Sequence, residues 1–394
     1  MSQEINKKET ALNPTVKRLG FISFLADVSS EMLYPITPIF LTTVLGASVT
    51  SLGIIEGTAE ATASLLKTYS GFWSDRIRKR KVFVWVGYLL AALAKPLTGL
   101  SQSWTHVLGA RSFDRVGKGL RTAPRDALLA ESVPENLRGA AFGWHRMMDT
   151  LGAAIGPLLA ILYLQYSSNL RLIYYLAFIP GLLAVFVALT IKEKRHELPP
   201  PSKHEKWAGF STLPSRFKYY LFSWTIFSLT NSSDVFLLLK TKLSGISLTD
   251  TILMYCFYNL VYALASPSLG KLSDKIGRKS VLVFGLVVFS LVYVGFAFAS
   301  VPLHFWGLFG IYGLFMAATE GVGKAFAIDL MDKDKKATAV GYLGTFTGIA
   351  TLFASAAAGF LWDHYGPVAT FLYGAGGALI VSGILLTRNW SRGT

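Results

Sequence analysis

Long apolar stretches alternate with short polar connections along the whole chain. A helix that crosses a membrane needs about 20 mostly apolar residues. Stretches that meet this requirement cover residues 18–45, 49–73, 82–101, 105–130, 139–164, 170–191, 217–241, 249–272, 280–299, 302–328, 338–361 and 367–388. Hydrophobic residues make up 52% of the chain and charged residues 15%, which is less charge than a soluble domain carries. The pattern predicts an all-α membrane protein with twelve membrane-spanning helices.

A cationic connection between the second and third stretches returns in the second half of the chain. It covers residues 71–81 and reappears over residues 270–280, at an offset of 199 residues. In each copy an acid, Asp75 or Asp274, stands four positions after a glycine and precedes a basic cluster. Because this offset is close to half of the 394 residues, it predicts that the chain is two copies of one unit.

The longest polar interval separates the two copies and reads as a linker. It runs from about residue 192 to 218 and contains three consecutive prolines and seven lysines or arginines. We therefore expect an N-terminal six-helix bundle over residues 1–191, a cytoplasmic linker over residues 192–216 and a C-terminal bundle over residues 217–394. A short amphipathic helix near Trp207 and Phe210 could lie on the membrane.

The distribution of basic residues predicts the topology. The N-terminal segment, the basic connections and the C-terminal tail hold 26 of the 38 lysines and arginines, whereas the opposite side holds Arg171, Lys240 and Lys242. The positive-inside rule then places both termini in the cytoplasm. The same bias explains the net charge of +15 without nucleic acid as a partner.

Few features of the sequence indicate a cofactor or a catalytic site. The single cysteine, Cys256, excludes an intramolecular disulfide and any multi-cysteine metal site. The sequence has no P-loop, no His-Glu-x-x-His and no Gly-x-Ser-x-Gly motif. We expect no cofactor and no metal.

Ionisable residues inside the stretches are candidates for proton coupling. Each costs roughly 2.5–3.5 kcal/mol at bilayer depth on insertion scales, so it usually faces a cavity or a partner. Burial and nearby cations act on a carboxyl pKa in opposite directions, and their balance could suit a proton carrier. The candidates lie on single helical faces of the first, second and fifth stretches and are Asp27, Glu31, Glu56, Glu60, His145 and Asp149.

The fourth stretch carries the densest charge. Within an arc of roughly 120° on a helix fall Arg111, Asp114, Arg115, Lys118, Arg121 and Arg125. A static ion-pair network and a cavity wall are both compatible with this face. We favour the wall, with Arg115 and Lys118 deepest, because five cations exceed the acids of that helix.

A cationic wall predicts the charge of the solute. Arginine offers paired donors that match carboxylate or phosphate, so the solute would be anionic, or zwitterionic if the acids of the first two stretches oppose the wall. Further cavity candidates are Tyr34, Asp234, Glu320 and Lys324. Glu320 and Lys324 are spaced for an i,i+4 ion pair, which is the simpler interpretation of those two.

Three motifs resemble those of the major facilitator superfamily and fall in the family's order. The repeated connection resembles its loop signature, although Arg78 stands where the family has glycine. Residues 115–123 are similar to its fourth-helix pattern, in which Arg115 would influence proton transfer. Gly152, Gly156 and Pro157 resemble the fifth-helix signature of its antiporters.

The resemblance implies two six-helix bundles around a central cavity that opens alternately to each side of the membrane. It also implies a charge network in which Glu131 and Arg138 join Asp75. The implied gating residues are Gly71, Asp75, Arg76, Glu131, Arg138, Gly152, Gly156, Pro157, Gly270 and Asp274.

The function implied by the resemblance is secondary active transport rather than catalysis. We expect a monomer in the bacterial inner membrane that exports a small organic solute in exchange for protons; its partners are the solute, protons and the lipid bilayer. One alternative is a proton-coupled uptake symporter of an organic anion or a metal chelate. Another is a membrane sensor, or an intramembrane enzyme that uses His145 and Asp149.

Overall fold

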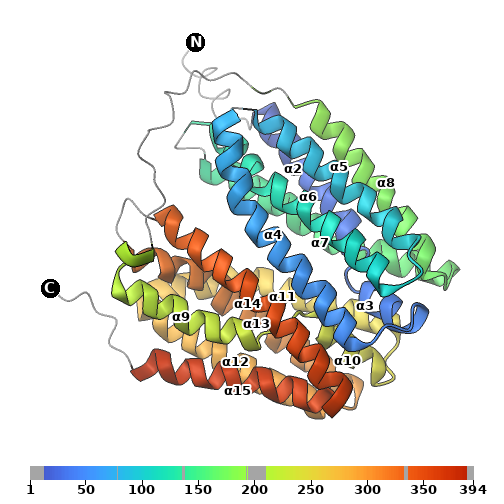
Figure 1. The fold of residues 1–394 in the computed structure, drawn as a ribbon, viewed down its shortest axis with the longest axis vertical. Coiled ribbons are helices and arrows are strands. Elements are labelled where there is room, and N and C mark those ends of the chain that lie inside the picture. The colour runs from blue at the N-terminus through green and yellow to red at the C-terminus, as the bar shows by residue number, and fades with distance from the viewer. Residues whose placement is uncertain are drawn as a thin grey trace. The chain divides into compact units, whose positions relative to one another are not determined.

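The computed structural model describes residues 13–77, 79–134, 138–191, 193, 210–331 and 336–387 (Figure 1). This part of the chain is built from helices, and no strand occurs in it. Its first half contains α2 (Pro14–Glu31), α3 (Thr37–Ile39), the π-helical turn η1 (Phe40–Val44), α4 (Val49–Ile77), α5 (Arg80–Gly99), α6 (Trp104–Glu131), α7 (Arg138–Tyr166) and α8 (Leu170–Leu189). Its second half contains the 3-10 turn η3 (Phe210–Thr212), α9 (Ser215–Thr230), α10 (Val235–Leu243), α11 (Leu248–Ile276), α12 (Arg278–Phe298), α13 (Pro302–Asp329), α14 (Lys336–Tyr365) and α15 (Pro367–Thr387).

Each of the twelve predicted stretches coincides with one helix or with one interrupted helix. Within the described residues, eight helices are long and apolar enough to cross a membrane; they are α5, α8, α11, α12, α13, α15 and parts of α7 and α14. The other four stretches carry the internal charges or are interrupted. Their weak apolar signal therefore follows from the polar groups that they bring into the bundle.

The first stretch is interrupted after Glu31. Tyr34 N–H still donates to the Ser30 carbonyl, 3.1 Å away, but Pro35 has no N–H to continue the ladder and restricts the residue before it. The chain resumes as α3 and η1. The acid Glu31 thus stands at a helix end inside the stretch.

The seventh stretch is interrupted at the corresponding acid. Helix α9 ends at Thr230, and α10 begins at Val235 directly after Asp234. Between them, Ser233 N–H donates to Ser355 Oγ of α14 over 3.3 Å. Ser29-Ser30-Glu31 and Ser232-Ser233-Asp234 are therefore sequence relatives that both mark helix breaks.

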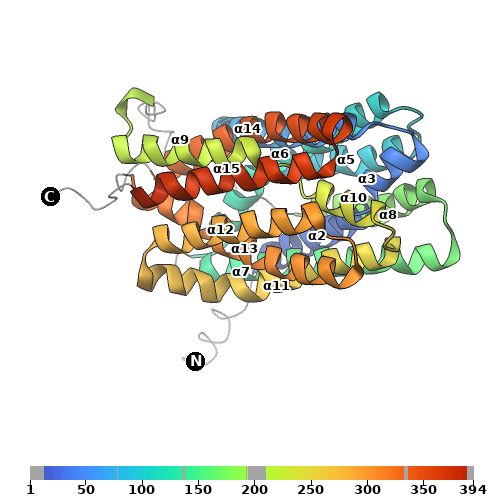
Figure 2. The same cartoon turned by 90° about the horizontal axis from the view of Figure 1, so that it is seen from below.

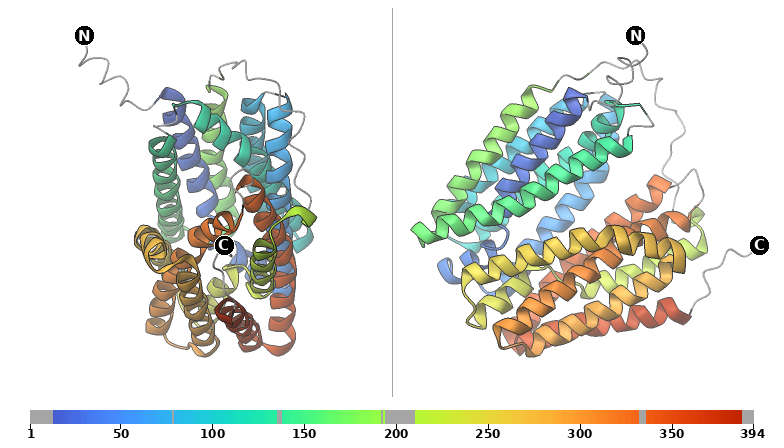
Figure 3. Two further views of the ribbon diagram at one scale, coloured as in Figure 1. Left: turned by 90° about the vertical axis from the view of Figure 1, so that its left-hand side faces the viewer. Right: turned by 180° about the vertical axis from the view of Figure 1, so that it is seen from behind.

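The chain forms two compact units by its internal contacts. Unit 1 comprises Met1–Ile36, Leu65–Ser101 and Gly109–Ser202, and unit 2 comprises Thr37–Ser64, Gln102–Leu108 and Lys203–Thr394. In unit 1, α2 packs against α7 and α8, and α5 packs against α8 (Figure 3). Buried Leu19, Val84, Leu129 and Val185 form part of its apolar core.

In unit 2, α9, α14 and α15 pack together, and α12 packs against both α13 and α15 (Figure 2). Its core is aromatic: the rings of Phe289 and Phe315 lie 4.8 Å apart and those of Phe289 and Tyr293 stack at 3.9 Å. The first half of α4 belongs to this unit. Its N-terminus is capped by Asp363 of α14, which accepts the N–H of Val49 at 3.1 Å and of Thr50 at 2.7 Å.

Candidate functional site

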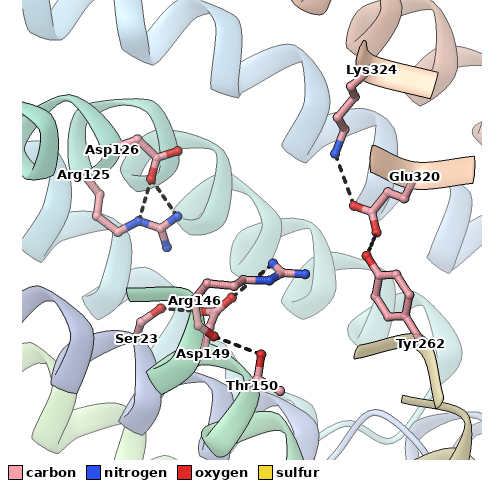
Figure 4. A network of polar contacts seen from close by, with 9 residues as sticks. All are labelled: Ser23, Arg125, Asp126, Arg146, Asp149, Thr150, Tyr262, Glu320 and Lys324. Carbon is pink, nitrogen blue, oxygen red and sulfur yellow. Dashed lines mark hydrogen bonds and ion pairs between the residues drawn. The ribbon is translucent and has the colours of Figure 1, made fainter. Parts of the chain in front are cut away.

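Two carboxyl groups meet where α2 packs against α7. The side chains of Asp27 and Asp149 lie close enough for each to influence the charge of the other, and Ser23 Oγ donates to Asp149 Oδ1 at 2.5 Å (Figure 4). An ionised carboxylate can only accept. Two neighbouring carboxyl groups can therefore form a hydrogen bond only when they hold one proton between them.

Glycines on α7 make that contact possible. A Cβ at Gly152 would lie 2.5 Å from the Phe24 carbonyl oxygen and 2.9 Å from Asp27 Cβ. A Cβ at Gly156 would lie 2.7 Å from the Val28 carbonyl oxygen. Small residues four apart let helices approach closely, and α7 packs closely against α2 at both glycines. The approach brings Asp27 within reach of Asp149.

Cations surround the carboxyl pair. Arg146 Nη1 lies 3.6 Å from Asp149 Oδ2, with its own side chain 66% exposed. Arg125 donates through Nε and Nη2 to Asp126 at 3.0 and 2.9 Å (Figure 4). His145 is buried, and its Nε2 has no hydrogen-bond partner among the described residues. The pair thus lies in a region of ionisable groups rather than apolar packing.

A second charged group ties α5 to α6. Lys95 Nζ lies 2.7 Å from Asp114 Oδ1, and both residues are buried. Arg115 Nε lies 3.8 Å from the other oxygen of Asp114, and Lys95 Nζ also reaches Ser30 Oγ of α2 at 3.4 Å. This part of the charged face is the ion-pair network that was the alternative to a cavity wall.

Arg121, two turns further along α6, differs from these pairs. Its residue is 7% exposed, and its Nε and Nη1 have no hydrogen-bond partner among the described residues. The guanidinium carbon lies 4.2 Å from the centre of the Tyr88 ring. Lys118, which was expected to lie deep, has an exposed side chain. Arg121 is thus the buried cation of this face.

Unit 2 holds a different kind of acid site. Tyr312 Oη donates to Asp234 Oδ1 at 2.7 Å, and Tyr258 Oη donates to Oδ2 at 3.3 Å. The two rings lie 5.3 Å apart. Asp234 is therefore held by neutral phenols at the break between α9 and α10.

The Glu320–Lys324 ion pair predicted from spacing forms on α13, at 3.2 Å. Tyr262 also donates a short hydrogen bond to Glu320 (Figure 4). The side chains of Glu320 and Lys324 are 41% and 55% exposed, so this pair is a surface feature of the isolated chain.

The other candidates come from several elements of the two units. Glu56 is buried and Glu60 exposed, and both belong to unit 2 by contacts, whereas Asp27 and Glu31 belong to unit 1. Tyr34 lies in the turn after α2, and Arg111 is partly buried in α6.

The structure shows the ion pairs of two gating candidates. Glu131 pairs with Arg80 at 2.8 Å, and in the second half Arg278 pairs with Asp274 at 2.7 Å and with Asp329 at 3.2 Å. Each half therefore joins its cationic connection to the end of a helix, α6 or α13.

The remaining gating candidates lie in different surroundings. Pro157 is buried inside α7, Gly71 faces Ala123, and no atom lies within 4 Å of a Cβ built on Gly270. The side chains of Asp75, Arg76 and Arg138 lie outside the described part of the structure, so their network stays a prediction.

Sequence reasoning missed the hydroxyl partners of the acids. Ser23, Tyr258 and Tyr312 all lie in apolar stretches. A hydroxyl group in such a stretch usually finds a partner when it is buried, so tyrosines in these stretches were a usable signal. Their pairing with particular acids could not be read without the helix packing.

A family model for the "Major Facilitator Superfamily" matches residues 19–241 and 220–390. An uncharacterized MFS-type transporter of Methanocaldococcus jannaschii is 41% identical over 395 residues, which cover 98% of this chain and 97% of that protein. The chain belongs to the major facilitator superfamily. It is an integral multi-pass membrane transporter of small molecules and not an enzyme, as the loop and helix motifs had implied.

More distant members of the superfamily carry more specific names. The multidrug resistance protein MdtG of Serratia proteamaculans is 27% identical over 318 residues, covering 76% of this chain and 74% of that protein. A crystal structure of a mutant nucleoside transporter, NupG, superposes with a TM-score of 0.81 at 14% identity, over 95% of this chain and 99% of that one. This likeness confirms the superfamily fold of two six-helix bundles.

Proposed function

We propose that the protein is a proton-coupled secondary transporter and that the Asp27–Asp149 pair holds the coupled proton. The observation that carries the proposal is the close approach of α2 and α7, which brings these two carboxyl groups together, because neighbouring carboxyl groups favour holding one proton between them. Asp27 and Asp149 are both partly exposed, which a group that exchanges protons needs. Of the six candidates for coupling, we choose these two because they lie where α2 packs on α7.

Export in exchange for protons is the first candidate for the direction. The multidrug resistance proteins among the relatives support it, as does the Gly152–Gly156 packing on which the resemblance to antiporters rests. The solute would be small, organic and anionic or zwitterionic. The protein would act as a monomer in the plasma membrane, with bundles over residues 1–191 and 217–394 and a cytoplasmic linker over residues 192–216.

Uptake of an organic anion together with a proton is the second candidate. It is favoured by Arg121, a buried cation without a hydrogen-bonded acceptor on two of its nitrogens. An anion that binds beside a carboxyl pair favours proton binding by that pair, because opposite charges attract. Proton and solute would then move in the same direction.

Proton movement in proteoliposomes separates these candidates. A pH-sensitive dye trapped inside reports protons while succinate, benzenesulfonate, inorganic phosphate or tetramethylammonium is supplied outside. Protons that enter with an added solute indicate symport, whereas protons that leave as the solute enters indicate exchange. If no solute changes the internal pH beyond protein-free liposomes, proton coupling is refuted for this panel and the carboxyl pair loses its proposed role.

The proposed topology has its own test. Fusions of a reporter that is active only in the cytoplasm, placed after Thr394 and after Ser202, should both be active. Activity of an export-dependent reporter at either position would refute cytoplasmic termini and linker.

A further inference from the structure

Arg121 on α6 is a buried cation, and its Nε and Nη1 lack acceptors among the described residues. We propose that Arg121, stacked on Tyr88, binds an anionic group of the transported solute, such as a carboxylate, phosphate or sulfonate, and that the proton held by Asp27 and Asp149 strengthens this binding. The inference rests on the proton site and the transport function proposed above. It names a substrate class and the residue that recognises it.

The unpaired donors of Arg121 are energetically costly because the residue is buried. Arg121 is 7% exposed, and its Nε and Nη1 have no hydrogen-bond partner among the described residues. A buried donor without a partner costs about 1–3 kcal/mol, and more when it is charged. A bound anion would remove that cost, because the guanidinium edge matches two oxygens of a carboxylate or phosphate.

The position of Arg121 is built into the crossing of α5 and α6. A Cβ at Gly87 would lie 2.6 Å from Arg121 Cβ and 2.6 Å from the Gly117 carbonyl oxygen, so only glycine permits this approach. It sets the guanidinium over the Tyr88 ring, 4.2 Å from the centre. Stacking occupies the guanidinium face and leaves its edge for a ligand. Tyr88 Oη is also buried without a partner among the described residues and could donate to the same anion.

Neighbouring cations already have acids. Lys95 lies 2.7 Å from Asp114, and Arg125 lies 2.9 Å from Asp126. Arg121 has no such hydrogen-bonded acid on its buried nitrogens. The positive charge of Arg121 does influence one acid, the carboxyl group of Asp27. Asp27 is therefore an electrostatic partner of Arg121.

That partner links the anion to the proton. When Asp27 and Asp149 share a proton, the pair carries one negative charge fewer and competes less with an incoming anion for Arg121. Linkage is reciprocal, so a bound anion favours proton uptake by the same amount. The other charged or titratable groups that act on the pair or on Arg121 are Glu31, Lys95, Arg125, His145 and Arg146. Proton and anion thus strengthen each other's binding, as in a symporter. This coupling supports the second candidate for direction, uptake together with a proton.

Calorimetry and thermal shift on the full-length protein test the inference. The protein is placed in nanodiscs of zwitterionic phosphatidylcholine, so that an anionic lipid headgroup is not the source of the anion. The probes are succinate, inorganic phosphate and benzenesulfonate, with tetramethylammonium as a cationic control. Benzenesulfonate stays ionised throughout the pH range, so any change in its affinity with pH comes from the protein.

We expect at least one anion to bind and stabilise the protein. Arg121→Gln should weaken that binding by more than about tenfold, as when one partner of a buried charge pair is lost, and Arg121→Lys should weaken it less. Arg18→Gln removes a partly exposed cation from α2 of the same unit, one that donates to the Thr190 carbonyl at 2.9 Å, and it should bind like the wild type. Tyr88→Phe keeps the ring under Arg121 and should cost only the contribution of the hydroxyl.

The proton linkage is tested with Asp27→Asn. In the wild type, the affinity for the anion should fall as pH rises, and the variant should lose this pH dependence. Binding of none of the anions, binding of tetramethylammonium alone, or equal affinity of wild type and Arg121→Gln would overturn the anion site. Proton movement in proteoliposomes is measured separately, so proton coupling can survive a failure of the Arg121 site.

Discussion

The two contact units surround a partly buried acid with different partners. In unit 1, Asp27 neighbours a second carboxyl group, that of Asp149, and a cation, Arg146, lies 3.6 Å from Asp149. In unit 2, Asp234 accepts from the phenols of Tyr258 and Tyr312. Both acids come from the first stretch of their repeat and lie near a helix break.

The difference separates a group that can exchange a proton from one that is held in place. Carboxyl and guanidinium partners change strength when a proton arrives, because the charge of the pair changes. Phenol donors stay neutral near physiological pH, so they fix a carboxylate without responding to protons. The internal repeat therefore keeps the helix geometry, while the partners on neighbouring helices decide what each acid can do.

Neutralising the acids should give the largest difference between the two units. We expect Asp27→Asn and Asp149→Asn to reduce proton-driven solute accumulation to the level of protein-free liposomes, because neither pair can then gain and lose a proton. Asp234→Asn should keep proton coupling. The measurement is accumulation with and without a pH gradient, at matched amounts of folded protein. If Asp234→Asn uncouples and Asp27→Asn does not, the roles of the units are reversed.

Breaking the buried ion pair of unit 1 should have the next largest effect. Lys95→Met leaves the Asp114 carboxylate without its 2.7 Å partner, and removal of one member of a buried pair costs about 3 kcal/mol or more. The double variant Lys95→Met/Asp114→Leu should recover most of the loss, since no lone charge remains. Thermal unfolding in detergent measures both, and equal losses in the single and double variants would contradict the pairing.

Removing one phenol in unit 2 should cost less. Tyr312→Phe deletes the 2.7 Å hydrogen bond to Asp234, and hydrogen bonds to charged groups contribute about 2 kcal/mol. Tyr365→Phe, whose residue is 70% exposed, is the matched control and should unfold at the wild-type temperature. A loss for Tyr312→Phe as large as for Lys95→Met would remove the distinction between the two units.

Glycine substitutions in the repeated connection should have the smallest effect on stability. Gly277 has φ of 90°, which L-residues rarely adopt, so Gly277→Ala should destabilise by about 1 kcal/mol. Gly270→Ala, in the helix and with no atom within 4 Å of a built Cβ, should be neutral or slightly stabilising. Unchanged unfolding temperatures for both variants would show that the left-handed turn carries no strain.

The sequence alone predicted the helices and the family. Apolar length located all twelve stretches, because a bilayer sets the length of a spanning helix. Repeated acids and glycines indicated two related halves, and Glu320 and Lys324 paired as their spacing predicted. Local rules sufficed for these features, since each depends on residues close together in the chain.

The sequence did not predict which side chains of different helices contact each other. From the stripe on α6 we expected Arg115 and Lys118 to lie deepest, yet Arg121 is the one buried over Tyr88 and Lys118 is exposed. Likewise Glu56 and Asp27 were equal candidates until α2 was seen to pack on α7. Asp363 caps α4 from more than 300 positions away, which no periodicity could reveal.

Periodicity predicts which face of a helix carries charge. It does not fix which neighbouring helix meets that face, because many pairings bury similar apolar area. Tertiary packing made that choice through close contacts at Gly87, Gly152 and Gly156. At those contacts the backbones of two helices approach closely. One side chain can then reach a partner on the facing helix, whereas the side chain one turn away cannot.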